Sequence, residues 1–192
     1  MKEEELVRGT KQKDENAYRC LVDQYREKVL RTITGLVHNP ADAEDLAQEV
    51  FIEIYRSIHS FREESKLSTW IYRIAVNKSI NFMNFKKRRA VFNHIEEFFT
   101  GKKKVNSHVY KNFAQDPSGK LEREEIAKAL HHALANLPKN QRIAFTLNKY
   151  EDLSYKEIAN IMQMKLPAVE SLIHRAKINL QKKLIHFYKH YE

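Results

Sequence analysis

The sequence predicts an all-α protein made of two helical domains joined by a linker. Glycine and proline each occur only four times in 192 residues, so few positions favour a turn over a helix. The prolines, which lie in or beside breaks in the helical pattern, are Pro40, Pro117, Pro138 and Pro167. Between the breaks, apolar side chains recur at spacings of three and four residues, the period of an amphipathic helix.

The first predicted element is a long helix that Asp14 caps and that runs to about Val37. Its apolar stripe consists of Tyr18, Leu21, Val22, Tyr25 and Val29. Cys20 lies inside this run, so we expect a buried, unreactive thiol. It is the only cysteine of the chain, which excludes an intrachain disulfide.

The second element is an acidic helix over residues 42–58, with Asn39 as N-cap and Pro40 in the first turn. One face carries Asp42, Asp45, Glu49 and Glu53, and another carries Leu46, Val50, Ile54 and Ile58. Capping and the helix dipole can explain the first two acids but not the last two. A solvated charged face and a protein-docking surface both fit this pattern.

A polar loop over residues 61–66 precedes the third element, a basic and aromatic helix predicted over Leu67–Arg89. Its polar stripe is Arg73, Asn77, Asn81, Asn84 and Arg88, and the helix ends in Lys86, Lys87, Arg88 and Arg89. Basic side chains neutralise phosphates and Asn bonds base edges, although a terminal basic cluster also complements the helix dipole. Asn is a mediocre helix former, so three on one stripe favour nucleic-acid binding. Trp70 is expected in the core because its helical neighbours are apolar.

The domain boundaries follow from where the helical period weakens and resumes. We predict a first domain over residues 1–95, a linker over 96–120 and a second domain over 121–192. The linker is rich in Lys, Asn, Ser and Gln. Helical periodicity returns at Leu121 and restarts after Pro138.

The second domain ends in a helix-turn-helix pattern. Ser154 and Glu157 form a capping box, a turn follows at residues 163–165, and a longer helix starts near Leu166 or Pro167. That helix buries Val169, Leu172, Ile173, Ala176 and Leu180, and leaves Glu170, Ser171, His174 and Arg175 outward. Arg175 suits guanine or phosphate, Ser171 suits phosphate or a base edge, and Glu170 suits the cytosine amino group. An ordinary helical hairpin is the alternative.

Charge and the remaining motifs restrict the function class. A net charge of +9 and a pI near 9.5 favour a polyanionic partner, although ribosomal contacts or acidic proteins would satisfy the charge equally. No signal peptide and no run of about 18 apolar residues occur, so we expect a cytoplasmic protein without membrane insertion. No phosphate loop, zinc-protease pattern or nucleophile constellation is present. We therefore expect neither an enzyme nor a bound cofactor or metal.

In order and spacing, these blocks resemble the bacterial RNA polymerase sigma factors of the small extracytoplasmic-function (ECF) group. The resemblance rests on residues 39–51, 61–62, 68–75 with Asn77, 137–138, 153–159 and 168–176. Each block is weak evidence alone, whereas their joint occurrence across nearly the whole chain is specific.

The resemblance implies roles for three surfaces. The acidic helix would bind the clamp coiled coil of the polymerase largest subunit through Asp42, Asp45, Gln48 and Glu49. The loop over residues 61–68 and the following helix would melt the minus-ten element and capture a flipped base, through Arg62, Ser65, Lys66, Asn77, Asn81 and Arg88. The helix-turn-helix would read the minus-35 element through Glu170, Ser171, His174 and Arg175. The implied partners are core polymerase, including its flap, promoter DNA and an anti-sigma factor.

Two residues depart from the pattern of the family. Gln163 stands in the turn where many members carry glycine, and side chains are strained at the positive φ of such a turn. Glu170 stands where many members carry a basic residue, which affects the expected DNA sequence preference.

A stand-alone repressor is the alternative from another class. Its second domain would bind paired DNA half-sites without polymerase, and its first domain would dimerise or bind an effector. This alternative leaves the acidic helix and the Asn-bearing helix unexplained.

Overall fold

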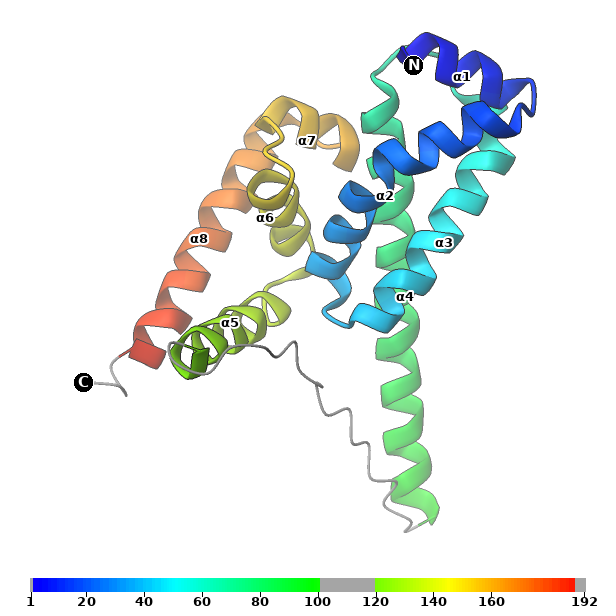
Figure 1. The fold of residues 1–192 in the computed structure, drawn as a ribbon. Coiled ribbons are helices and arrows are strands. Elements are labelled where there is room, and N and C mark those ends of the chain that lie inside the picture. Colours follow the sequence, from blue (N-terminus) through cyan, green and yellow to red (C-terminus); the bar gives the residue numbers. More distant parts are fainter. Residues whose placement is uncertain (1, 101–119, 189–192) are drawn as a thin grey trace.

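A computed structural model describes residues 2–100 and 120–188 of the chain. Over these residues the structure is helical and contains no strand, which confirms the predicted all-α class (Figure 1). The α-helices are α1 (Glu3–Lys11), α2 (Glu15–Val37), α3 (Pro40–Ser57), α4 (Leu67–Thr100), α5 (Lys120–Ala135), α6 (Lys139–Tyr150), α7 (Tyr155–Met162) and α8 (Leu166–Tyr188), with a short 3₁₀ turn, η1 (Ile58–Ser60), after α3.

Helices α2 and α3 begin at the predicted capping residues. The Asp14 carboxylate accepts a hydrogen bond of 2.9 Å from the backbone N–H of Asn16 at the start of α2. The Asn39 side chain accepts one of 3.1 Å from the N–H of Asp42, and Pro40 lies in the first turn of α3. Both caps satisfy backbone donors that the helices themselves leave unpaired.

Helix α1 was not predicted from the sequence. It buries Leu6, Val7 and Thr10, whose spacing is helical but spans barely one turn. The Glu3 carboxylate accepts a hydrogen bond of 2.8 Å from the N–H of Leu67, the first residue of α4. An acidic side chain from α1 therefore caps a helix that begins more than 60 residues later.

Helix α4 is longer than the predicted Leu67–Arg89 and continues to Thr100. No glycine or proline occurs between Leu67 and Thr100, and the first such residue is Gly101. The predicted end was wrong because a weaker apolar pattern does not stop a helix without a breaking residue. The end of α4 extends away from the other helices (Figure 1).

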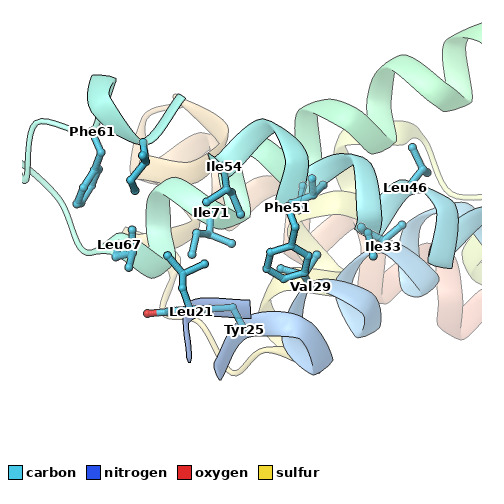
Figure 2. Close-up of a cluster of buried hydrophobic side chains, with 14 of the residues drawn as sticks. Leu21, Tyr25, Val29, Ile33, Leu46, Phe51, Ile54, Phe61, Leu67 and Ile71 are labelled. Atoms are coloured by element: carbon cyan, nitrogen blue, oxygen red, sulfur yellow. The ribbon is translucent and has the colours of Figure 1, made fainter. Parts of the chain in front are cut away.

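The core of the first domain lies between α2, α3 and the first half of α4, as Figure 2 shows. Its fully buried side chains include Leu21, Val29, Ile33, Ile54 and Ile71. Leu21 and Val29 belong to the apolar stripe predicted for α2, and Ile54 belongs to the stripe predicted for α3. The partly buried Trp70 packs on Phe61, with ring centroids 5.4 Å apart, as expected for a core residue.

Cys20 is exposed, contrary to the prediction of a buried thiol. Its neighbour Leu21 is fully buried and Tyr25, four residues further, is nearly so. Consecutive helical residues lie about 100° apart, so the position before a buried residue can face solvent.

A second core joins the two domains. Leu36, Tyr72 and Val76 of the first domain pack with residues of α6, α7 and α8. The residues that complete this cluster are Ile143, Ala144, Leu147, Ile158, Ala159, Ile161, Val169 and Ile173. Helices α2 and α6 approach closely, since a Cβ added at Gly35 would lie 2.8 Å from Thr146 Cγ2. The domains are therefore packed against each other through an apolar interface.

Within the second domain, α5 packs on α8 through a smaller cluster of Ala133, Leu134, Leu137, Ala176 and Leu180. Residues 101–119 of the predicted linker lie outside the described residues. None of the helices that the structure describes is long and apolar enough to cross a bilayer.

A histidine pair lies between the two domains. His38 ends α2 in the left-handed conformation (φ 58°) and is 2% exposed. Its Nδ1 lies 3.1 Å from Nε2 of His131 on α5, so one nitrogen donates and the other accepts. Burial, His131 and the nearby Arg142 guanidinium lower the pKa of His38 to about 3, and burial lowers the pKa of His131.

Because this histidine pair is buried and its pKa values are lowered, we expect acid to destabilise the packed form of the two domains. A histidine whose pKa is lowered on folding stabilises the fold above its ordinary pKa, near 6.5, and this contribution falls as the pH decreases towards about 3. We expect a lower melting temperature at pH 5.5 than at pH 7.5, measured by circular dichroism. The His38→Asn variant, whose side chain tolerates left-handed backbone, should show a flatter pH dependence. Equal pH dependence in both proteins would contradict this prediction.

Candidate functional site

The predicted polymerase-binding residues share one face of α3. Asp45, Gln48 and Glu49 are exposed. Asp42 is partly covered because it forms an ion pair with Lys86 of α4. The result is a continuous acidic surface that rests on the first-domain core.

Lys78 of α4 partly neutralises this surface. Its Nζ lies 3.6 Å from a Glu49 carboxylate oxygen and 3.7 Å from one of Glu53. Glu53 is half-buried and faces α4, whereas Asp45 has no ion pair among the described residues. Asp45 and Glu49 are therefore the acids most available to a partner.

The sequence interpretation missed two apolar residues of this surface. Ile52 is 48% exposed and Tyr55 is 40% exposed, and they continue the Gln48 face along α3. The Tyr18 ring packs edge-on against Tyr55 at 4.9 Å and so orients it. Large apolar side chains next to charged ones are typical of protein interfaces. Neither residue belongs to the apolar stripe predicted for α3, and this could have identified both of them as exposed from the sequence.

All six predicted minus-ten residues are exposed in the structure. They come from the loop before α4 (Arg62, Ser65, Lys66) and from α4 itself (Asn77, Asn81, Arg88). Glu63 in the same loop forms an ion pair of 3.0 Å with Lys11 of α1, which ties the loop to the first domain. Asn77 and Asn81 are one turn apart, so their amides project from the same face of α4.

Two basic residues near the start of α4 contact the second domain. Lys66 Nζ donates to Glu157 Oε1 at 2.9 Å, and Arg73 donates to the backbone carbonyl of Asn160 at 2.8 Å. Both partners belong to α7, the first helix of the helix-turn-helix. No local sequence pattern indicated this contact, because its partners are about 90 residues apart.

Glu157 is also the third helical residue of the predicted capping box of α7, in which Ser154 is the N-cap. Its carboxylate accepts hydrogen bonds from the Ser154 N–H at 3.1 Å and from Ser154 Oγ at 2.8 Å. The Lys66 ammonium and the Ser154 donors lower the pKa of Glu157 to about 2. The same contact raises the pKa of Lys66. Glu157 therefore takes part both in the capping box of α7 and in the contact between the two domains.

The helix-turn-helix has the predicted geometry. Gln163 ends α7 in the left-handed conformation, with φ 53° and ψ 44°, and its N–H bonds the Ala159 carbonyl. Helix α8 buries Val169, Ile173 and Ala176 against the core. The outward residues are Glu170, Ser171, His174 and Arg175, all exposed. A recognition face near the N-terminus of α8 is therefore open to a large ligand.

Replacing Gln163 with glycine should stabilise the second domain. A side chain in the left-handed region is strained, whereas glycine is not, although glycine loses more entropy on folding. We expect the free energy of unfolding to rise by about 0.5–1 kcal/mol and the melting temperature by a few degrees. The Gln163→Ala variant keeps the strain and serves as control; an equal gain in that variant would contradict this explanation.

Comparisons with known proteins decide the family. Residues 21–89 match Sigma-70 region 2, and residues 124–180 match Sigma-70 region 4. The chain is 36% identical over 186 residues to the RNA polymerase sigma-H factor of Pseudomonas aeruginosa, covering 95% of this chain and 93% of the relative. It is 35% identical over 179 residues to the ECF RNA polymerase sigma-E factor of Haemophilus influenzae, covering 93% of each. This chain is an ECF sigma factor.

Solved structures share the fold of this sigma factor. CnrH, in complex with the cytosolic domain of CnrY, is 18% identical with a TM-score of 0.68, covering 96% of this chain and 97% of that chain. The Bartonella quintana sigma factor RpoE, in complex with the anti-sigma factor NepR, is 23% identical with a TM-score of 0.65, covering 87% and 96%. As a family member, the sigma factor described here is a transcription initiation factor that directs RNA polymerase to specific promoters.

Proposed function

We propose that the sigma factor docks on the clamp coiled coil of the polymerase largest subunit through α3. Asp42, Asp45, Gln48 and Glu49 supply the contacts. Ile52 and Tyr55, both exposed, extend the acidic surface with an apolar patch further along α3. Charged residues steer the encounter with a partner, and apolar side chains beside them add affinity when the partner covers them.

In this proposal, the loop before α4 and α4 itself open the minus-ten element. Arg62, Ser65, Lys66 and Arg88 follow the backbone of the displaced strand, and Asn77 and Asn81 contact bases. Support comes from the exposure of all six residues and from the amide pair on one face of α4. Melting requires a basic track beside a place for unstacked bases.

Helix α8 reads the minus-35 element in duplex DNA. Arg175 bonds guanine or phosphate, and Ser171 and His174 bond phosphates or base edges. Glu170 is available to accept a hydrogen bond from cytosine, which changes the preferred sequence relative to members with a basic residue there. Exposure of these four side chains near the N-terminus of a 23-residue helix supports this assignment.

The domain assignment gives the two units separate promoter elements. Residues 1–95 bind the polymerase clamp and the minus-ten element, and residues 121–192 bind the minus-35 element and the flap. Residues 96–120 link the two through the polymerase cleft. The sigma factor acts in the cytoplasm with the polymerase, without enzymatic activity of its own.

An anti-sigma factor is part of the proposal. The CnrH and RpoE structures contain CnrY and the anti-sigma factor NepR, respectively. A protein of this kind would hold the present sigma factor inactive by covering the α3 surface or the α8 face. Pull-down from cells grown in several states should recover it, and failure in every state would count against it.

The observation that carries the proposed function is the presence in one chain of an exposed acidic surface on α3 and an open recognition face on α8. Run-off transcription with bacterial core polymerase on a genomic promoter library tests it. We expect promoter-specific transcripts that depend on the added sigma factor. No transcripts, together with tight binding to duplex DNA alone, would support a repressor instead.

A further inference from the structure

We propose that a cavity between the two domains binds a small phosphorylated ligand of the nucleotide class, through cationic side chains of α4 and α6. The cavity has a volume of about 450 Å³. Pockets for small molecules commonly have volumes of about 300–1,000 Å³ and often lie between domains. The proposed function uses none of the residues that line this cavity, so failure of the inference would leave that function standing.

The walls of this cavity are strongly basic. Lys86 and Lys87 come from α4, and Lys139 and Arg142 come from α6. In the described part of the chain, no acidic residue lines the cavity. Asp42 forms an ion pair with Lys86, whereas the other three cations have no ion pair among the described residues. A ligand with several negative charges would therefore meet an excess of positive charge.

The Arg142 guanidinium is poorly satisfied by the protein. Its Nη1 donates to the Ala135 carbonyl at 3.4 Å, and its Nη2 lies 2.7 Å from Met83 Sδ, a weak acceptor. Its Nε is buried and has no hydrogen-bond partner among the described residues. Burial lowers the pKa of Arg142, as expected for a cation that is removed from water without a carboxylate beside it. An anion in the cavity would compensate this charge and offer better acceptors than a thioether.

Helix α6 begins at the cavity and adds to its positive potential. Lys139, which lines the cavity, is the first residue of this helix. Pro138 precedes it and makes no side-chain hydrogen bond to cap the helix, and the first turn contains no acidic residue. The first N–H groups of a helix lack intrahelical acceptors and carry partial positive charge, so they favour a phosphate nearby. The backbone of α6 therefore supports the anion that the four side chains attract.

The cavity also offers an apolar surface for the rest of the ligand. Phe82 and Met83 line it beside the cations. Phe82 is partly buried, and Lys86 Nζ lies 4.9 Å from the centroid of its ring. Because every nucleobase has a π-face that stacks on aromatic rings, an aromatic ring beside cations favours a nucleotide over an inorganic anion. A nucleic-acid strand also carries phosphates, but a cavity of this volume encloses a single nucleotide rather than a strand.

Isothermal titration calorimetry of the free chain tests the assignment, with ATP, inorganic triphosphate and adenosine as probes. We expect ATP to bind with a Kd below about 0.1 mM, triphosphate to bind several-fold more weakly, and adenosine not to bind detectably. Absence of ATP binding would overturn the proposal. Triphosphate binding as tight as that of ATP would overturn the nucleotide assignment.

A matched pair of double variants locates the site. Lys87→Ala, Lys139→Ala removes two cations from the cavity, so ATP should bind at least about tenfold more weakly. Lys149→Ala, Lys182→Ala removes the same charge from exposed positions elsewhere on α6 and α8, and should bind ATP as the wild type does. An equal loss in both double variants would show attraction by net charge alone and would overturn the proposal.

The Arg142→Met variant separates ligand binding from a structural role. Methionine is unbranched and uncharged, so the variant should lose ATP binding, while its melting temperature without ligand should stay the same or rise because a poorly compensated buried charge is removed. Unchanged ATP binding would overturn the proposal. If this variant does not fold, the two lysine variants decide.

A labelled single-stranded oligonucleotide tests the other source of phosphates. We expect Lys87→Ala, Lys139→Ala to bind it with the same affinity as Lys149→Ala, Lys182→Ala, because the two variants have lost the same charge. If the cavity variant instead binds the oligonucleotide more weakly than the control and binds ATP normally, the cavity contacts DNA and the proposal is wrong.

Discussion

Reversal of two charges on α3 is expected to abolish promoter-specific transcription. In the variant Asp45→Lys, Glu49→Lys, the acids most available to a partner become basic. Like charges across an interface cost several kcal/mol, and each 1.4 kcal/mol or so lowers the affinity about tenfold. We expect the affinity for core polymerase, measured by fluorescence titration, to fall by at least about a hundredfold and run-off transcripts to disappear.

The fold should survive this double substitution. Asp45 and Glu49 are exposed, and surface ion pairs such as Glu49 with Lys78 contribute little to stability. The double variant Asp23→Lys, Glu27→Lys is the matched control, because both residues are exposed on α2 at the same spacing of four. Full transcription from the α3 variant, or equal loss in the control, would contradict docking through α3.

Loss of Arg175 should have the second largest effect. Replacing an arginine that bonds a base costs about 1–3 kcal/mol and relaxes specificity at that base pair. In the Arg175→Ala variant we therefore expect about a tenfold or larger decrease in transcription from promoters that depend on the minus-35 element. Promoters with a scrambled minus-35 element should change little, so discrimination between the two is the measurement.

Lys182→Ala gives the comparison for Arg175. Lys182 is exposed on the same helix about two turns further on, so its removal takes away the same charge outside the recognition face. A similar decrease in both variants would show that only net charge matters. The melting temperature should be nearly unchanged in each, because both side chains are exposed.

Much of this fold could be predicted because its signals are local. The N-caps at Asp14 and Asn39 and the capping box of Ser154 with Glu157 each lie within a few residues of the helix that they start. The outward face of α8 follows from helical period alone, which depends only on neighbours three and four residues apart. For the same reason the candidate DNA-binding and polymerase-binding residues could be named before their exposure was known.

Other features could not be predicted, and each failure has a physical reason. Helix α1 is short, and part of its role is to place Glu3 at the start of α4, a distant contact. The end of α4 was predicted too early. The apolar periodicity weakens after Arg89, but the residues there still favour a helix and the helix continues. Cys20 was predicted to be buried, but it is exposed and the buried side chain is that of the next residue, Leu21.

Residue type and short spacing were therefore enough to predict the helices from α2 onwards, most of their buried faces and the family. How the two domains meet depends on tertiary contacts. The bonds of Glu157 with Lys66 and of Glu151 with Arg31 join residues about 90 and 120 positions apart. No local pattern specifies such pairs, since each joins elements that only tertiary packing brings together.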